Sequence, residues 1–254
     1  MDLIYALGGG MGHLTRALNL AAILGPVRIL HQAPYEPPSP MSGVLTRLPE
    51  GASAAWVRQW LSAHPAERLI VDTFPGGVAH EIDDATLGGF SQTVLVQRHL
   101  KRGTYVDYAR LADRFDVRWL PYPPDACAWE GDVEGIFVGP LVRRLERAPG
   151  PRASVAVIGD PNRLPLRWRA MMPTDTVYWE GHFTRLPAAE RFVCVGAGHN
   201  LSWELWTAKV AAAHLPLPRR YDDQHRRAER IVFQTQGRPP DPVGRAGRVP
   251  FASP

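Results

Sequence analysis

The chain has 254 residues, of which 45% are hydrophobic and 21% charged, as in an ordinary globular protein. No apolar run approaches the ~18 residues needed to cross a bilayer, and the acidic, strand-like start does not resemble a signal peptide. The formal net charge of +4 comes without a zinc-finger, helix-turn-helix or aromatic-and-basic pattern, so we expect no nucleic-acid partner. A mild positive field suits anionic small substrates or an anionic membrane surface equally well. The two cysteines, Cys127 and Cys194, lie far apart without metal-ligand spacing, which predicts a cytoplasmic protein and no bound metal.

Strands and helices alternate along the first half of the chain. Short apolar runs predict strands at 3–7, 27–30, 69–71 and 93–96. Apolar residues at helical spacing predict helices at 14–22, 56–61 and 105–115. Strands separated by helices favour a parallel, doubly wound sheet, so the predicted fold class is α/β.

A proline- and glycine-rich segment at 147–152 interrupts this pattern and predicts a linker between two domains, 1–148 and 152–236. The second domain restarts with a strand and turn at 154–159, and continues with a strand at 192–195 and a helix at 201–210. From residue 237 to 254 the chain offers little to bury, so we expect a disordered tail.

The segment Gly8-Gly9-Gly10-Met11-Gly12-His13 joins the first predicted strand to the first predicted helix. Its glycines permit positive φ angles and close approach of a ligand, and the N–H groups of a helix N-terminus favour an anion or a polar oxygen. His13 would then face the crevice above the strand ends, although a tight turn with a capping imidazole explains the same residues. The dinucleotide fingerprint does not fit, because Gly8 and Gly10 are not followed by its last glycine and His31 stands where an acidic residue is needed.

Two more polar residues follow predicted strands of the first half. Asp72 ends an apolar strand, so its carboxylate lies at the edge where such sheets bind ligands, unless it caps the turn that follows. Arg98 follows the strand 93–96, where a guanidinium can meet a phosphate or carboxylate, although a solvated salt bridge is the commoner arrangement.

The second half repeats this arrangement. The segment Gly196-Ala197-Gly198-His199-Asn200 joins a strand to a helix, and Glu204 falls one turn into that helix. Its carboxylate can accept two hydrogen bonds from a ribose diol, or can offset the helix dipole. Asp222-Asp223-Gln224 can gather sugar hydroxyls, or Asp222 can cap a short helix.

In this order the segments resemble those of the MurG-like GT-B glycosyltransferases, which include the bacterial enzyme that adds N-acetylglucosamine to the lipid-linked cell-wall precursor. Gly8 to His13, followed by Arg16, resembles the opening glycine loop of the family. The segment 72–77 with Glu81 resembles an Asp-x-Phe-x-x-Gly segment of uncharacterised relatives. In the second half, the segment 196–200 with Glu204 resembles the loop that binds the donor nucleotide. The segment Asp222-Asp223-Gln224 resembles an Asp-x-Gln segment that contacts the donor sugar.

The resemblance implies a GT-B-like fold, in which two Rossmann-like half-domains face a cleft, here with the second one truncated. It implies metal-independent hexosyl transfer from a nucleotide-sugar, UDP-linked, to an acceptor hydroxyl, without a cofactor. The acceptor would be a glycan, a lipid-linked compound at the inner face of the membrane, or a small molecule. A neutral imidazole near its reference pKa of ~6.5 suits proton removal, which makes His13 the candidate general base or a donor-phosphate contact, and Asp72 its orienting partner.

The remaining site residues fall into three predicted groups. The phosphate or acceptor loop is Gly9, Gly10, Gly12, Arg16 and Arg98. The nucleotide-binding residues are Gly198, His199, Asn200 and Glu204. The donor-sugar residues are Asp222, Asp223 and Gln224.

The sequence also departs from the family. Its second half is shorter, Gly159-Asp160-Pro161-Asn162 replaces a glycine-rich turn, and the family's last helix has no counterpart. Two other functions therefore stay open: a nucleotide-sugar epimerase or hydrolase of the same fold, and a non-catalytic nucleotide-sugar-binding relative or subunit.

Overall fold

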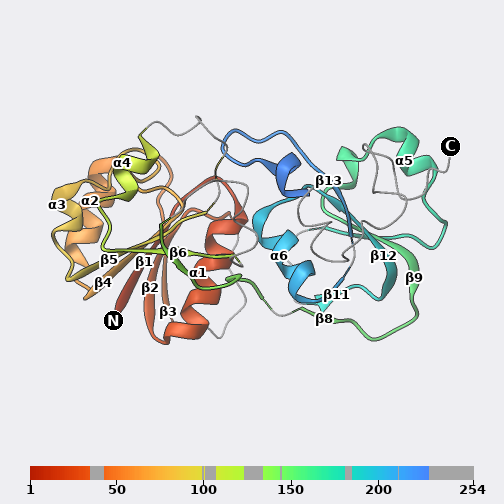
Figure 1. Cartoon of the computed structure of the whole chain (residues 1–254), viewed down its shortest axis with the longest axis horizontal. Helices are drawn as coiled ribbons and strands as arrows, with labels where there is room; N and C mark the ends of the chain where they lie inside the picture. The colour runs from red at the N-terminus through yellow and green to blue at the C-terminus, as the bar shows by residue number, and fades with distance from the viewer. Residues whose placement is uncertain are drawn as a thin grey trace. The chain divides into compact units, whose positions relative to one another are not determined.

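The computed structural model describes residues 1–34, 43–98, 100, 107–122, 134–143, 145–180, 185–210 and 212–228. The chain divides into two compact units, Met1–Val142 and Arg143–Pro254 (Figure 1). We predicted the division after residue 148, but the second unit begins earlier, because strand β8 (Glu146–Arg147) pairs with β11 (Arg185–Leu186). The predicted tail, 237–254, lies outside the described residues.

The first unit contains, among its described residues, a parallel sheet with the strand order β3-β2-β1-β4-β5-β6-β7. The strands are β1 (Asp2–Ala6), β2 (Val27–His31), β3 (Gly43–Arg47), β4 (Arg68–Asp72), β5 (Gln92–Val96), β6 (Val117–Leu120) and β7 (Ile136–Phe137). The helices are α1 (Met11–Leu24), α2 (Ala54–Ala63), α3 (Asp84–Leu87) and α4 (Tyr108–Ala112). This confirms the predicted doubly wound α/β sheet.

Successive residues of β1 point to opposite faces of the sheet, and helices cover both faces. Tyr5 packs with Trp60 of α2 on one face, and Ile4 packs with Leu14 and Ala17 of α1 on the other. Figure 1 shows α1 on one side of the sheet and α2, α3 and α4 on the other. Because both faces are buried, the central strands are continuous apolar runs, which is why their positions could be read from the sequence.

The second unit has a smaller parallel sheet with the order β10-β9-β12-β13. Its strands are β9 (Ala153–Ile158), β10 (Val177–Trp179), β12 (Ala189–Val195) and β13 (Ala212–Leu215), and its helices are η2 (Pro161–Arg163), α5 (Leu166–Ala170) and α6 (His199–Thr207), with a further helical turn at 224–228. Leu205 of α6 packs with Ile158 on one face, and Trp168 of α5 packs with Val157 on the other.

Several elements differ from the sequence-based prediction, which named neither the short helices α3 and α5 nor the strands β6, β7, β10 and β13. The helix expected at 105–115 is only α4, Tyr108–Ala112, in the described part of that segment. Strand β3 was not predicted, because it lies at the edge of the sheet and its Val44 is exposed, so it lacks a buried apolar run. No helix in the described ranges is long and apolar enough to cross a membrane.

The loop after β4 folds around the buried carboxylate of Glu81. That carboxylate accepts hydrogen bonds from the Tyr5 hydroxyl and, at 2.7 Å, from the N–H of Ala79. The N–H of Val78 donates to the Tyr5 hydroxyl at 2.9 Å. Gly77 has a φ of +80° and lies against the Glu81 side chain, so the glycine and the glutamate of this segment are both explained by the fold of the loop.

Gly77→Ala should destabilise the protein more than Gly51→Ala. Both glycines have a left-handed backbone conformation, with φ of +80° and +72°, so an alanine at either position lowers the free energy of unfolding by about 1–2 kcal/mol. At Gly77 the added Cβ would also lie 2.5 Å from Cδ of Glu81, whereas nothing lies within 4 Å at Gly51. We expect overpacking to add about 1–3 kcal/mol at Gly77 alone, measured by urea unfolding. Equal losses in the two variants would contradict this description of the loop.

Candidate functional site

The site of the first unit lies where the strand order reverses. From β1 the chain moves outward to β2 and β3, and then returns to place β4 on the other side of β1. Open α/β sheets bind their ligands beyond the carboxyl ends of the strands at this reversal. Here the end of β1 leads into the glycine loop and α1, and β4 ends at Asp72.

His13 lies in the first turn of α1, directly over Gly8. A Cβ added to Gly8 would lie 2.3 Å from Nε2 of His13, and Gly8 has a φ of +152°. Only glycine therefore leaves room beside Nε2. The ring of His13 also stacks on Phe74, with 5.5 Å between centroids, so its orientation is fixed from two sides.

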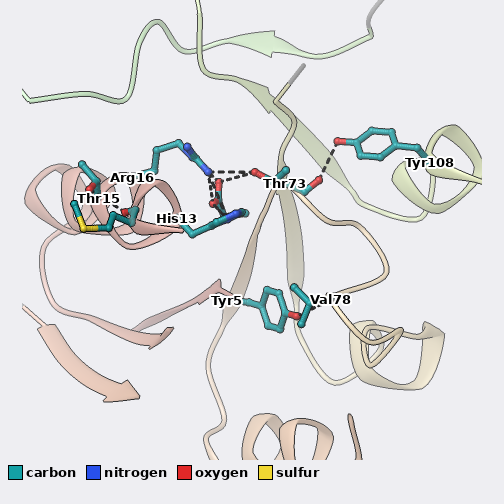
Figure 2. A network of polar contacts seen from close by, with 9 residues as sticks. Tyr5, His13, Thr15, Arg16, Thr73, Val78 and Tyr108 are labelled. Carbon is teal, nitrogen blue, oxygen red and sulfur yellow. Dashed lines mark hydrogen bonds and ion pairs between the residues drawn. The ribbon is translucent and has the colours of Figure 1, made fainter. Parts of the chain in front are cut away.

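Asp72 binds both His13 and Arg16. Its Oδ2 lies 2.6 Å from Nδ1 of His13. Arg16 donates from Nε to Oδ1 at 2.8 Å and from a terminal nitrogen to Oδ2 at 2.7 Å, a two-pronged ion pair. Figure 2 shows the side chains of His13 and Arg16 converging from α1 on this point. Arg16 and Asp72 are almost completely buried, at 0% and 1% exposure, and His13 is 7% exposed.

These contacts determine which groups are charged. Burial alone would raise the pKa of Asp72, but the charge of Arg16 and the contact with His13 hold that pKa well below its usual range. Burial lowers the pKa of His13 below 6.5 and outweighs the attraction of Asp72. At neutral pH the group is therefore a carboxylate, a guanidinium and a neutral imidazole. Because the carboxylate only accepts hydrogen bonds, Nδ1 of His13 carries the proton and Nε2 keeps its lone pair.

Thr73, next to Asp72, is held in a strained conformation. Its φ of +77° is rare for a β-branched residue. Its N–H donates to the carbonyl of Val96 at 3.0 Å. Its carbonyl accepts from the hydroxyl of Tyr108 at 3.1 Å, and Arg16 donates to its hydroxyl at 3.3 Å (Figure 2). Strain of this kind costs about 1–3 kcal/mol and is kept where the surroundings enforce it, often at functional sites.

The structure brings some predicted residues of the first unit together and gives others a different place. His13 and Asp72 meet, and His13, which we expected to face the crevice, is 7% exposed. Arg16 was predicted to belong to a phosphate or acceptor loop, but it pairs with Asp72, because a buried carboxylate requires a counter-charge. Arg98 is half-buried beyond the end of β5, and its charge helps to lower the pKa of His13.

The three glycines of the predicted loop surround the start of α1. Gly9 and Gly10 are exposed and Gly12 is half-buried. Gly10 occupies the N-cap position, where no side chain caps the helix, and its N–H donates to the carbonyl of Gly8 at 2.9 Å. A helix start of this kind presents backbone N–H groups toward the same edge as Asp72.

In the second unit, the glycine-rich turn leads into α6 as predicted. Gly198 is the N-cap of α6 and no side chain caps this helix. His199 is buried and Asn200 half-buried in the first turn. Glu204 is 1% exposed, and its Oε1 accepts from Nε of Arg143 at 2.8 Å, so the carboxylate is already half of an ion pair.

The predicted donor-sugar residues contact the protein itself. Oε1 of Gln224 accepts from the N–H groups of Ala197 and Leu217, both at 2.9 Å. Asp222 binds Arg227 in a two-pronged pair. The helix cap considered for Asp222 is made by Asp223 instead, whose Oδ1 accepts from the N–H of Arg226 at 3.2 Å.

Sequence reasoning missed Arg143 and Arg227. Each pairs with a carboxylate that was singled out, but Arg143 precedes its partner Glu204 by 61 residues. Arg227 follows Asp222 by five residues, a spacing that brings side chains together only when the chain turns between them. The described residues include no group of three or more His, Cys, Asp and Glu side chains that could hold a metal ion.

No protein-family model matches the sequence, and no curated protein matches it significantly. Among solved structures, the chain is similar to Arabidopsis thaliana UGT89C1 complexed with UDP-L-rhamnose, with a TM-score of 0.56 and 12% identity over 92% of this chain and 82% of that chain. The complex of UGT89C1 with quercetin gives a TM-score of 0.57 and 11% identity over 91% and 82%. This chain has the GT-B fold. At such identities the likeness is one of fold, and it confirms the predicted fold class.

Asp72→Asn should strongly destabilise the first unit of this GT-B fold. The substitution leaves the guanidinium of Arg16 buried without its counter-charge, which typically costs about 3–5 kcal/mol. The double variant Arg16→Met with Asp72→Asn removes both charges and should recover a large part of that loss. Urea unfolding measures both. A single variant within about 1 kcal/mol of the wild type would contradict the buried ion pair.

Proposed function

We propose that this chain is a glycosyltransferase that moves a sugar from a UDP-linked donor to an acceptor hydroxyl, with His13 as general base. The observation that carries the proposal is the 2.6 Å contact between Nδ1 of His13 and Oδ2 of Asp72 at the strand-order reversal. A carboxylate that orients a neutral histidine is the usual arrangement for activating a hydroxyl. The GT-B fold shared with UGT89C1, solved with UDP-L-rhamnose and with quercetin, supports a nucleotide-sugar donor and a small-molecule acceptor.

In the proposed reaction, the acceptor hydroxyl hydrogen-bonds to the lone pair of Nε2 of His13, beside Gly8. As the acceptor oxygen bonds to the anomeric carbon of the sugar, its proton passes to Nε2. The bond between the anomeric carbon and the diphosphate breaks, and its electron pair leaves with UDP. Asp72 stabilises the imidazolium that forms, as the carboxylate does in other histidine-based sites.

We assign the donor to the second unit. The start of α6 has no side-chain cap, so its N–H groups and helix dipole suit a diphosphate beside Gly198, His199 and Asn200. Arg143 holds Oε1 of Glu204, and we assign the ribose diol to the other carboxylate oxygen. Gln224 and Asp222 support this turn, and Asp223 caps the helical turn at 224–228, so we assign these three residues a part in sugar binding through the position of the turn.

The finer assignments also belong to this proposal. We propose a hexosyl donor, a mechanism that needs no metal ion, and an acceptor that is a glycan, a lipid-linked compound or a small molecule. The resemblance of the glycine loop and of the Asp72 segment to MurG-like enzymes supports a bacterial, cytoplasmic enzyme that works at the inner face of the membrane.

The direct test incubates the full chain with UDP-sugars and a panel of acceptors, and follows released UDP and products by mass spectrometry. Glycosylated acceptor is the expected product. Free sugar without acceptor dependence would make the protein a hydrolase, and an isomeric nucleotide-sugar would make it an epimerase. Nucleotide binding without any product would make it a binding protein. Each of these three results overturns the transferase proposal.

His13→Gln should reduce turnover far more than stability. Loss of a general base typically costs ~10²–10⁴ in rate. His64→Gln is a matched control, because His64 follows α2 and precedes β4, at the opposite end of the sheet from Asp72. We expect the control to keep wild-type turnover in steady-state assays. A His13 variant that keeps its specific activity would show that the histidine is structural.

The pH dependence of turnover should follow His13. A base acts in its unprotonated form, and burial lowers the pKa of His13 below 6.5. The acid limb of kcat/KM should therefore have its midpoint below pH 6.5, and activity should be retained at pH 6.5 and lost as the pH falls further. A midpoint above pH 6.5 would contradict the neutral, buried imidazole.

A further inference from the structure

Arg227 connects two segments of the second unit and is 3% exposed. One terminal nitrogen donates to the carbonyl of Ala197 at 2.6 Å and to Oδ2 of Asp222 at 3.1 Å. The other donates to Oδ1 of Asp222 at 2.5 Å. A planar guanidinium can make this fork and still reach a backbone carbonyl, which a lysine ammonium cannot match.

Arg227 is one of several groups that hold the turn at 196–198, which precedes α6, by hydrogen bonds. The N–H of Gly196 donates to the carbonyl of Leu215 at 2.7 Å, and the N–H of Ala197 donates to Gln224. Gly196 has a φ of +106°. With the carbonyl of Ala197 on Arg227, both backbone polar groups of Ala197 are held by side chains from the segment 222–228.

This support decides where the first turn of α6 points. Ala197 directly precedes Gly198, the N-cap of the helix, so a shift of the peptide between them moves the N–H groups that follow. A displacement of about 1 Å in a positioned binding group can cost ~10² in rate or affinity. Arg227 and Gln224 therefore hold the peptide whose displacement would most directly weaken binding at the start of α6.

We propose that Arg227 is a positioning residue for the nucleoside diphosphate subsite at the start of α6. The proposal rests on the donor assignment made above. Arg227 acts through the carbonyl of Ala197 and through Asp222, and does not touch the nucleotide. This role also explains why the carboxylate of Asp222 and the amide of Gln224 face the protein, because both groups orient the turn that binds the donor.

The test compares Arg227→Gln and Arg227→Lys with the control Arg219→Gln, which removes the same charge from an exposed position. Titration calorimetry measures the Kd for UDP, and hydrogen exchange of the full chain reports the amides of residues 196–201. We expect UDP binding to weaken about 10- to 100-fold in Arg227→Gln and less in Arg227→Lys, with faster exchange at 196–201 in both. The Arg219 variant should match the wild type.

The outcomes separate this inference from the donor assignment. If wild-type protein binds no UDP, the donor assignment fails and this inference fails with it. If the wild type binds UDP and both Arg227 variants bind it equally well, only the positioning role is overturned. Should Arg227→Gln unfold, Asp222→Asn removes the partner carboxylate while Arg227 keeps its bond to Ala197. Unchanged UDP affinity and unchanged exchange in Asp222→Asn and Arg227→Lys would then overturn the role.

Discussion

The site of the first unit depends on one buried carboxylate, that of Asp72. A charge at 1% exposure is unfavourable unless it is paired, and Arg16 pairs with both of its oxygens. The same pairing keeps Asp72 ionised and therefore able only to accept a hydrogen bond from His13. The tautomer of His13 and the lone pair on Nε2 follow from that arrangement, whereas burial lowers the pKa of the ring. Arg16 thus acts on the histidine through the carboxylate.

Both units place a glycine-containing turn between a strand and a helix and fix the surroundings of that turn with residues from a distant segment. In the first unit, Asp72 at the end of β4 meets His13 in the first turn of α1. In the second, Arg227 and Gln224 hold Ala197 before α6. The turns need glycine for backbone conformation and space, so they cannot supply these fixing side chains themselves. Each unit also contains a buried ion pair beside its turn, formed by Arg16 with Asp72 in the first unit and by Arg227 with Asp222 in the second.

Local sequence patterns predicted the central strands and the residues at their ends, because these depend on the burial of neighbouring residues in the chain. The central strands are apolar runs because helices cover both faces of the sheet, and the predicted positions of Asp72 and Gly198 at element ends followed from those runs. The ion pairs were not predictable in the same way. Arg16 meets Asp72 across 56 residues, and Arg143 meets Glu204 across 61, so the partner depends on the topology and not on spacing. The inward direction of Gln224 likewise depends on where β13 and the turn at 196–198 meet.

The protonation state of His13 tests the central account most directly. Two-bond proton–nitrogen NMR correlations of the ring nitrogens at pH 7, with the nine histidines labelled and the His13 signals identified by their loss in His13→Gln, report which nitrogen carries the proton. The account predicts a neutral ring with the proton on Nδ1 and an unprotonated Nε2. A protonated imidazolium at pH 7 would contradict it, because the ring would then have no lone pair to accept a proton from a hydroxyl. A neutral ring with its proton on Nε2 would also contradict it, because His13 could then neither donate from Nδ1 to Asp72 nor accept a proton at Nε2.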